Sequence, residues 1–162
     1  MVPVSIESFK NAMRRFATGV TVVTSVKNGE PRGVTVSAFA SVSLEPPTVL
    51  ICVNREARSY LFISTSKIFC VNVLSANQQA LAQRFAARIR ERQFEGVDYF
   101  IDRTGAAVLR GVLAYVDCEV VEEHHAGSHS VFIGRAVSLG VHGGSPLGYF
   151  DGRYHDFGLE TP

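Results

Sequence analysis

One stretch of the chain, residues 33–46, alternates apolar and polar side chains over an unusual length. Successive side chains of a strand point to opposite faces, so this pattern predicts one core face and one face carrying hydroxyls. An average strand has about 5–6 residues, and we therefore expect a bend or bulge partway along the stretch. The apolar positions are Val34, Val36, Ala38, Ala40, Val42 and Leu44, and the intervening ones are Thr35, Ser37, Phe39, Ser41 and Ser43.

The hydroxyl face has two interpretations. A row of small polar side chains on a sheet face that meets solvent is the more common case. Alternatively, these hydroxyls and the nearby backbone donors lie against a flat, polar ligand. Features elsewhere in the chain are needed to choose between the two.

The rest of the chain has the rhythm of a mainly β protein with short helices. A helix is expected to begin after Ser5, which can cap it, and to end near Gly19. Asn28-Gly29 is typical of a tight hairpin turn. Further short helices are expected within 54–67 and 75–87, and strands at residues 20–26, 48–53, 68–74, 112–120, 131–141, 147–150 and 153–157. These elements predict a closed or half-closed antiparallel barrel formed by a single domain, residues 1–162.

Composition and charge exclude several classes of function. The net charge of +1 lacks the clustered basic excess of a dedicated nucleic-acid-binding protein. No apolar run approaches the roughly 20 residues that a membrane-spanning helix needs, and the first residues do not resemble a secretory leader. The three cysteines lie too far apart for a CxxC pair, so we expect reduced thiols and a cytoplasmic protein.

The chain contains no familiar hydrolytic or nucleotide-binding signature: no G-x-S-x-G, P-loop or G-x-G-x-x-G motif. His124 and His125 are adjacent and would point to opposite faces of a strand, so we expect no metal site there. His129 follows a predicted turn and would point from a strand end toward the barrel mouth, although an isolated histidine is more often structural. Arg58 and Ser59 stand near a helix start, which suits either a phosphate or an ordinary cap.

Five stretches in register carry a family likeness, and together they run from about residue 9 to residue 157. They are FKNAMRRFATGVTVVT (9–24), GVTVSAFASVSLEPP (33–47), IFCVNVLSANQQALAQRFA (68–86), GSHSVFIG (127–134) and PLGYFDGRYH (146–155). The chain resembles the flavin reductase family, the small NAD(P)H:flavin oxidoreductases that serve two-component flavin-dependent monooxygenases. This resemblance implies an FMN-binding split β-barrel, an antiparallel Greek-key barrel with short flanking helices, that works as a homodimer.

The resemblance also implies an activity. The protein would reduce free FMN or FAD with NADH or NADPH by hydride transfer, and the reduced flavin would diffuse to a separate oxygenase component. Because the flavin supplies the redox chemistry, the protein needs no nucleophile or base of its own, in keeping with the missing motifs.

Site residues follow from the same resemblance, segment by segment. The flavin ring and ribityl chain would contact Thr35, Val36, Ser37, Ala38 and Phe39, with Ser41 and Ser43 close by. The ribityl and phosphate groups would contact Cys52, Val53, Asn54, Arg58 and Ser59, and Phe85 and Ala86 would lie beside the flavin. His129 would donate a hydrogen bond to the nicotinamide carboxamide, and the same side would be lined by Tyr149, Phe150, Gly152 and Tyr154.

One departure from the family pattern concerns the triplet before that histidine. Members often carry Gly-Asp-His, whereas this chain has Gly127-Ser128-His129, which removes a carboxylate near the nicotinamide. The preference for NADH or NADPH therefore stays open, as does the choice between FMN and FAD.

Three other interpretations remain at this point. One is another split barrel, either a pyridoxine-phosphate-oxidase-like enzyme or a protein that uses bound flavin directly on a substrate. Another is a non-catalytic carrier of flavin or haem, with His129 as an axial ligand or a structural residue. The third is a barrel with no ligand, which does not explain the uncharged hydroxyl face of residues 33–46.

Overall fold

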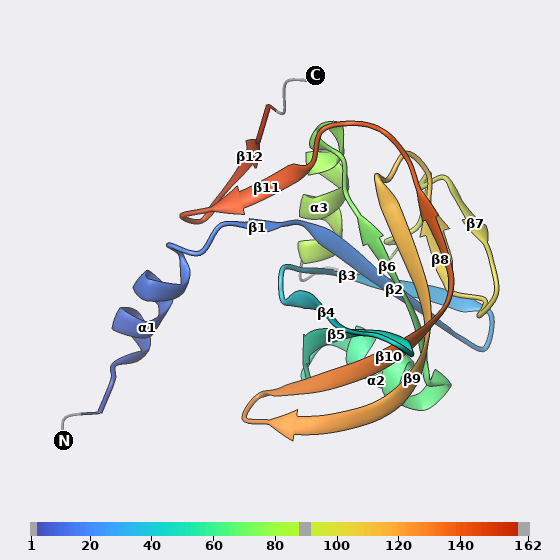
Figure 1. The fold of residues 1–162 in the computed structure, drawn as a ribbon, viewed down its shortest axis with the longest axis horizontal. Helices are drawn as coiled ribbons and strands as arrows, with labels where there is room; N and C mark the ends of the chain where they lie inside the picture. Colours follow the sequence, from blue (N-terminus) through green and yellow to red (C-terminus); the bar gives the residue numbers. More distant parts are fainter. Residues whose placement is uncertain (1–2, 88–91, 159–162) are drawn as a thin grey trace.

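A computed structural model of the protein describes residues 3–87 and 92–158. Within this part of the chain, the largest unit is a seven-stranded antiparallel sheet with the order β3-β2-β6-β9-β10-β5-β4 (Figure 1). Its strands are β2 (Thr21–Lys27), β3 (Glu30–Val36), β4 (Phe39–Leu44), β5 (Pro47–Asn54), β6 (Ile68–Val73), β9 (Ala114–Ala126) and β10 (His129–Val141). The mainly β prediction is confirmed.

The sheet is rolled into a barrel that stays open along one seam. β3 and β4 are its two edge strands, yet only Ser37 and Ala38 connect them. Three Cα–Cα steps span at most about 11 Å, so the two edges must approach each other at this connection. Beyond it the edges separate, and β4 pairs with β5 alone among the described strands. This is the expected split barrel, and the expected bend lies at Ser37-Ala38.

Smaller elements flank the barrel. β1 (Thr18–Gly19), β11 (Leu147–Phe150) and β12 (Arg153–Asp156) form a three-stranded sheet within the described chain, and β7 (Tyr99–Ile101) pairs with β8 (Ala107–Leu109). The β7–β8 hairpin was not predicted, because three-residue strands are too short to show a period. The helices are α1 (Ile6–Met13), α2 (Arg58–Ser66) and α3 (Gln79–Ala86), the last preceded by the 3₁₀ turn η1 (Ala76–Gln78). No helix in the described residues is both long and apolar enough to cross a membrane.

The α1 helix stands away from the barrel (Figure 1). Its predicted cap is confirmed, since the Ser8 amide donates to Ser5 Oγ at 3.1 Å. The predicted end at Gly19 is wrong. The helix stops at Met13, because Thr18 and Gly19 pair with β11 instead of continuing the helix. None of the eight helical residues is buried.

Large apolar side chains that are almost completely buried form two clusters on opposite faces of β2. One contains Val23, Ile51, Phe69, Val71 and Phe132, and the other contains Val22, Leu74 and Phe85. Two glycines let aromatic rings approach the strands closely. A Cβ on Gly134 would lie 2.3 Å from Phe69 Cζ, and one on Gly33 would lie 2.6 Å from Phe85 Cδ1. Both positions therefore exclude any larger side chain without repacking.

The prediction that one face of residues 33–46 lies in the core is correct only for the first half of the stretch. Val36 is buried, but Val42 is 51% exposed and Leu44 is 92% exposed. The bend moves the chain from one sheet edge to the other, and nothing among the described residues covers β4 there. Thr35 also leaves the predicted open hydroxyl face, because its Oγ1 donates to the Ala82 carbonyl at 2.6 Å.

Candidate functional site

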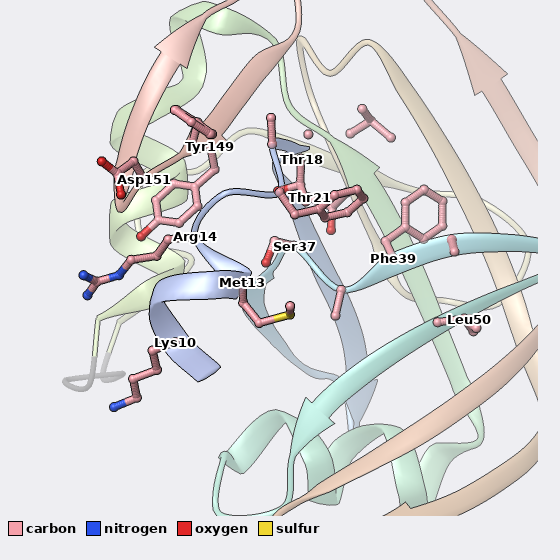
Figure 2. A pocket seen from close by; sticks show the side chains of 17 residues that line it. Lys10, Met13, Arg14, Thr18, Thr21, Ser37, Phe39, Leu50, Tyr149 and Asp151 are labelled. Atoms are coloured by element: carbon pink, nitrogen blue, oxygen red, sulfur yellow. The ribbon is translucent and has the colours of Figure 1, made fainter. Parts of the chain in front are cut away.

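A cavity of about 1000 Å³ lies between α1, the Ser37-Ala38 bend and the turn that joins β11 to β12 (Figure 2). We call it the edge cavity. Its volume is at the upper end of the range for small-molecule sites. It is lined by Lys10, Met13, Arg14, Phe16, Ala17, Thr18, Gly19, Thr21, Ser37, Ala38, Phe39, Ala40, Leu50, Val73, Tyr149, Phe150 and Asp151.

The floor of the edge cavity consists of the bend and its neighbours. Small side chains at Ser37 and Ala38 leave the backbone accessible, and Phe39 and Leu50 provide an apolar wall (Figure 2). The end of β3 before the bend is tied to β2, because Thr21 Oγ1 donates to the Val36 carbonyl at 2.6 Å. A flat ring can therefore approach this floor closely without meeting a charge.

The rim of the edge cavity is held together by contacts between the two residues that follow α1 and the β11–β12 turn. The Asp151 amide donates to the Arg14 carbonyl at 3.1 Å, and Arg15 Nη1 lies 3.9 Å from Asp151 Oδ2. Asp151 and Gly152 have φ of 50° and 79°, the conformation that an Asp-Gly hairpin turn requires. Beside the turn, the rings of Tyr149 and Tyr154 meet edge-on at 5.3 Å.

A second group of predicted residues follows the end of β5. The Cys52 amide donates to the Ala38 carbonyl at 3.1 Å, which joins this strand directly to the cavity floor. Two residues further, Asn54 pairs in register with His129 at the start of β10. The bend, the β5 end and His129 therefore form one continuous band along the open side of the barrel. Burial raises the pKa of the Cys52 thiol, so this thiol is neutral near pH 7.

His129 lies at the exposed tip of the β9–β10 hairpin. Its Nδ1 is 2.9 Å from Ser128 Oγ. The tip is tied to the end of β5, because the Arg55 amide donates to the Ser128 carbonyl and Arg55 Nη2 donates to the Gly127 carbonyl at 2.7 Å. This imidazole is thus held at a defined place while its ring stays accessible.

The two residues at the start of α2 differ in exposure. Arg58 is exposed, whereas Ser59 is buried and its Oγ donates to the Gly33 carbonyl at 3.1 Å. The helix has no side-chain cap, since its N-cap residue is Ala57. Among its first amides, that of Tyr60 donates to the Ala57 carbonyl at 3.0 Å.

The structure brings five predicted site residues into the edge cavity: Ser37, Ala38, Phe39, Tyr149 and Phe150. It places others elsewhere. The Phe85 side chain is fully buried in the core, where its ring lies 5.1 Å from the Phe94 ring. Ser43 Oγ donates to the Glu45 carbonyl at 3.1 Å, within the turn that follows β4. The remaining predicted residues outside the cavity lining are Thr35, Val36, Ser41, Cys52, Val53, Asn54, Arg58, Ser59, Ala86, His129, Gly152 and Tyr154.

Sequence reasoning missed the α1 side of the cavity, namely Lys10, Met13 and Arg14. The apolar spacing predicts the helix but not its place, which depends on the contact of Arg14 with the distant Asp151.

The adjacent histidines contact separate carboxylates: His124 Nε2 lies 2.7 Å from Glu122 Oε2, and His125 Nε2 lies 3.5 Å from Glu123 Oε1.

Fold and site together define an open antiparallel barrel whose cavity has an uncharged floor and charged residues at one rim. Residues 13–158 match the sequence model of the flavin reductase like domain. The reductase subunit HsaB of a flavin-dependent monooxygenase from Rhodococcus jostii is 40% identical over 147 residues, covering 90% of this chain and 75% of that protein. FMN reductase (NADH) SmoA from Agrobacterium fabrum is 37% identical over 150 residues, 93% of this chain and 85% of that protein.

Solved structures agree with these relatives. Flavin reductase PheA2 in its native state superposes with a TM-score of 0.89 at 38% identity, covering 96% of this chain and all of that one (100%). The NADH:FAD oxidoreductase SgcE6 from Streptomyces globisporus, in complex with NAD and FAD fragments, gives a TM-score of 0.91 at 31% identity, with 100% of each chain covered. The chain belongs to the flavin reductase like domain family, and the resemblance seen in the sequence is confirmed.

Proposed function

We propose that this protein is an NAD(P)H:flavin oxidoreductase that reduces free FMN or FAD and supplies the reduced flavin to a separate monooxygenase. The observation that carries the proposal is the edge cavity, whose floor is uncharged and lined by backbone, small side chains and aromatic rings. The names of the relatives, reductase components of monooxygenases and NADH-dependent FMN reductases, support the same activity.

The described residues fit a flavin. The cavity of about 1000 Å³ is large enough for a three-ring system, and Phe39 and Tyr149 offer aromatic surface. β4 is an edge strand, so one side of its backbone has donors and acceptors free for the polar rim of a ring. When bound, the flavin accepts a hydride from the reduced nicotinamide and provides the redox chemistry.

The protein's own residues bind the flavin and the pyridine nucleotide and hold them in position. We assign the ring to Ser37, Ala38 and Phe39, and the ribityl and phosphate groups to the β5 end and Arg58. His129 donates a hydrogen bond to the nicotinamide carboxamide, because its ring is accessible and held by the hairpin tip. Correct placement of two reactants supplies most of the catalysis in such a transfer.

The same contacts suit release of the product. The predicted ring contacts are uncharged, and Ser37 and Ala38 are exposed. A ligand held by such contacts at the protein surface can dissociate, as it must if a separate oxygenase is to use it.

We also infer that the protein is a homodimer. Large apolar side chains are exposed on α1 and β4: Ile6 is 75% exposed, Phe9 is 58% exposed, and Leu44 is 92% exposed. Exposed apolar groups of this size favour association, and a second copy of the chain offers a symmetric, closed interface. This interface would also cover part of the open barrel side.

The activity is tested by mixing the purified protein with NADH or NADPH and excess FMN or FAD, and following nicotinamide absorbance. The proposal predicts catalytic oxidation that depends on added flavin. A non-catalytic flavin or haem carrier would bind its ligand but consume no nicotinamide, and this result would contradict the proposal.

A further inference from the structure

Two cationic side chains, Lys10 and Arg14, lie at one mouth of the edge cavity. Lys10 lies in the last turn of α1, and Arg14 is the C-cap residue with helical backbone angles, so the two residues lie on the same flank, four positions apart. Figure 2 shows both projecting on the same side as Asp151 and Tyr149, whereas Phe39 and Leu50 lie at the other end. The cavity therefore has one polar, charged mouth and one apolar interior.

The positive charge at this mouth is not neutralised within the described part of the chain. Asp151 is the acidic residue of the cavity lining, and its carboxylate faces Arg15 at 3.9 Å. Glu7 is one turn from Lys10 along α1, but no ion pair joins them in the described residues. Lys10 and Arg14 thus leave two cations facing the mouth.

We propose that Lys10 and Arg14 form an anion subsite that binds a phosphate group of a nucleotide whose ring lies in the edge cavity. This proposal rests on the proposed function. Both flavin and pyridine nucleotides join a flat ring to phosphate through a flexible chain, which matches the apolar interior and cationic mouth. The guanidinium offers a fork of donors to phosphate oxygens, and the ammonium adds a compact positive charge.

This subsite is separate from the start of α2, where Arg58 does not line the cavity. α1 would thereby bind substrate in addition to forming the subunit interface. Because the flavin phosphate is assigned above to the β5 end and Arg58, the subsite is expected to bind the phosphates of the pyridine nucleotide. If it binds the flavin phosphate instead, the assignment of that phosphate to Arg58 is wrong, and comparison of substrates that lack the phosphate distinguishes the two sources.

The test uses Lys10→Gln, Arg14→Gln and the double variant, assayed with riboflavin, which has the ring but no phosphate, and with FMN. If the subsite binds the flavin phosphate, the KM for FMN rises by roughly three- to tenfold, while the KM for riboflavin and kcat stay unchanged. If it binds the phosphates of the pyridine nucleotide, the KM for NADH rises by a similar factor with riboflavin as acceptor. Arg14→Lys keeps the positive charge, so its KM values should lie closer to those of the wild type than the values of Arg14→Gln do.

Arg103→Gln is the matched control, because it removes one exposed cation from the loop between β7 and β8, away from the cavity. Unchanged KM values for both nucleotides in the double variant would overturn the subsite. An equal rise in the KM for riboflavin and in the KM for FMN would also overturn it, because the two side chains would then affect the shape of the cavity and not the binding of phosphate. Wild-type protein that oxidises no NADH would instead contradict the proposed function. The dissociation constants of the wild type and the double variant for FMN, riboflavin and NADH would then test the subsite directly, and values for FMN and NADH that the double variant leaves unchanged would overturn it.

Discussion

The two sides of the rolled sheet differ in how far their apolar side chains are covered. At the closed side, β2 and β6 are buried on both faces, and Val22 and Val71 are completely buried. At the open side, β4 alternates apolar and polar residues but leaves Val42 and Leu44 exposed. The closed side is covered within one chain, whereas the open side has exposed apolar groups that a ligand or a second copy can cover.

Hydrogen bonding shows the same contrast. At the closed side the Leu109 amide donates to the buried Asn72 Oδ1 at 2.8 Å. Nearby, the buried carboxylate of Asp117 accepts from the Thr104 amide at 2.9 Å. At the open side β4 has one strand neighbour among the described residues, so the backbone groups along its other edge are free of strand pairing. We therefore expect substitutions at the closed side to change stability and substitutions at the open side to change binding.

The largest expected effect is in the packed core, where β10 meets Phe69 of β6. In Gly134→Ala, the new Cβ would lie 2.3 Å from Phe69 Cζ and 3.0 Å from Cys118 Cβ. We expect the free energy of unfolding to fall by about 3 kcal/mol, because the ring must move within a filled core. Urea titration measures this change, and Gly143→Ala is the control, since no described atom lies within 4 Å of its added Cβ. Equal stability of the two variants would contradict the packing account.

Next in size is the effect of Leu44→Ser on assembly. Leu44 is 92% exposed, so its loss should leave the stability of one chain nearly unchanged. If β4 forms part of a dimer, the dissociation constant should rise by about tenfold, the equivalent of about 1.4 kcal/mol. Sedimentation velocity measures this change, with Leu61→Ser on α2 as the control. Wild-type protein that sediments as a monomer at micromolar concentration would refute the dimer.

A smaller effect is expected at His129. His129→Ala should raise the KM for NAD(P)H by roughly three- to tenfold, because one hydrogen bond to the carboxamide is lost. The KM for flavin should change little. Steady-state kinetics with each substrate varied in turn measures both values, and His125→Ala, from the same hairpin, is the control. Equal changes in the two KM values would argue against a nicotinamide contact.

Local signals in the sequence predicted most of the fold. Alternation located the strands, and Asn28-Gly29 forms its turn with φ of 53° and 76°. Alternation failed for Val42 and Leu44 because it shows which side chains share a face but not whether that face is covered. The cavity floor at Ser37–Phe39 could be named from family likeness, whereas Lys10 and Arg14 could not, because distant contacts place α1.

The most direct test of the open side as the flavin site is the affinity of Ser37→Leu for FMN and FAD, measured by quenching of flavin fluorescence. Ser37 is exposed on the cavity floor, so leucine should be tolerated by the fold but should occupy the space of the ring. Thr65→Leu, an exposed position on α2, is the control for added apolar surface. The account predicts a dissociation constant at least about tenfold higher for Ser37→Leu, which corresponds to about 1.4 kcal/mol, and no change for Thr65→Leu. Unchanged flavin affinity in a folded Ser37→Leu protein would contradict it.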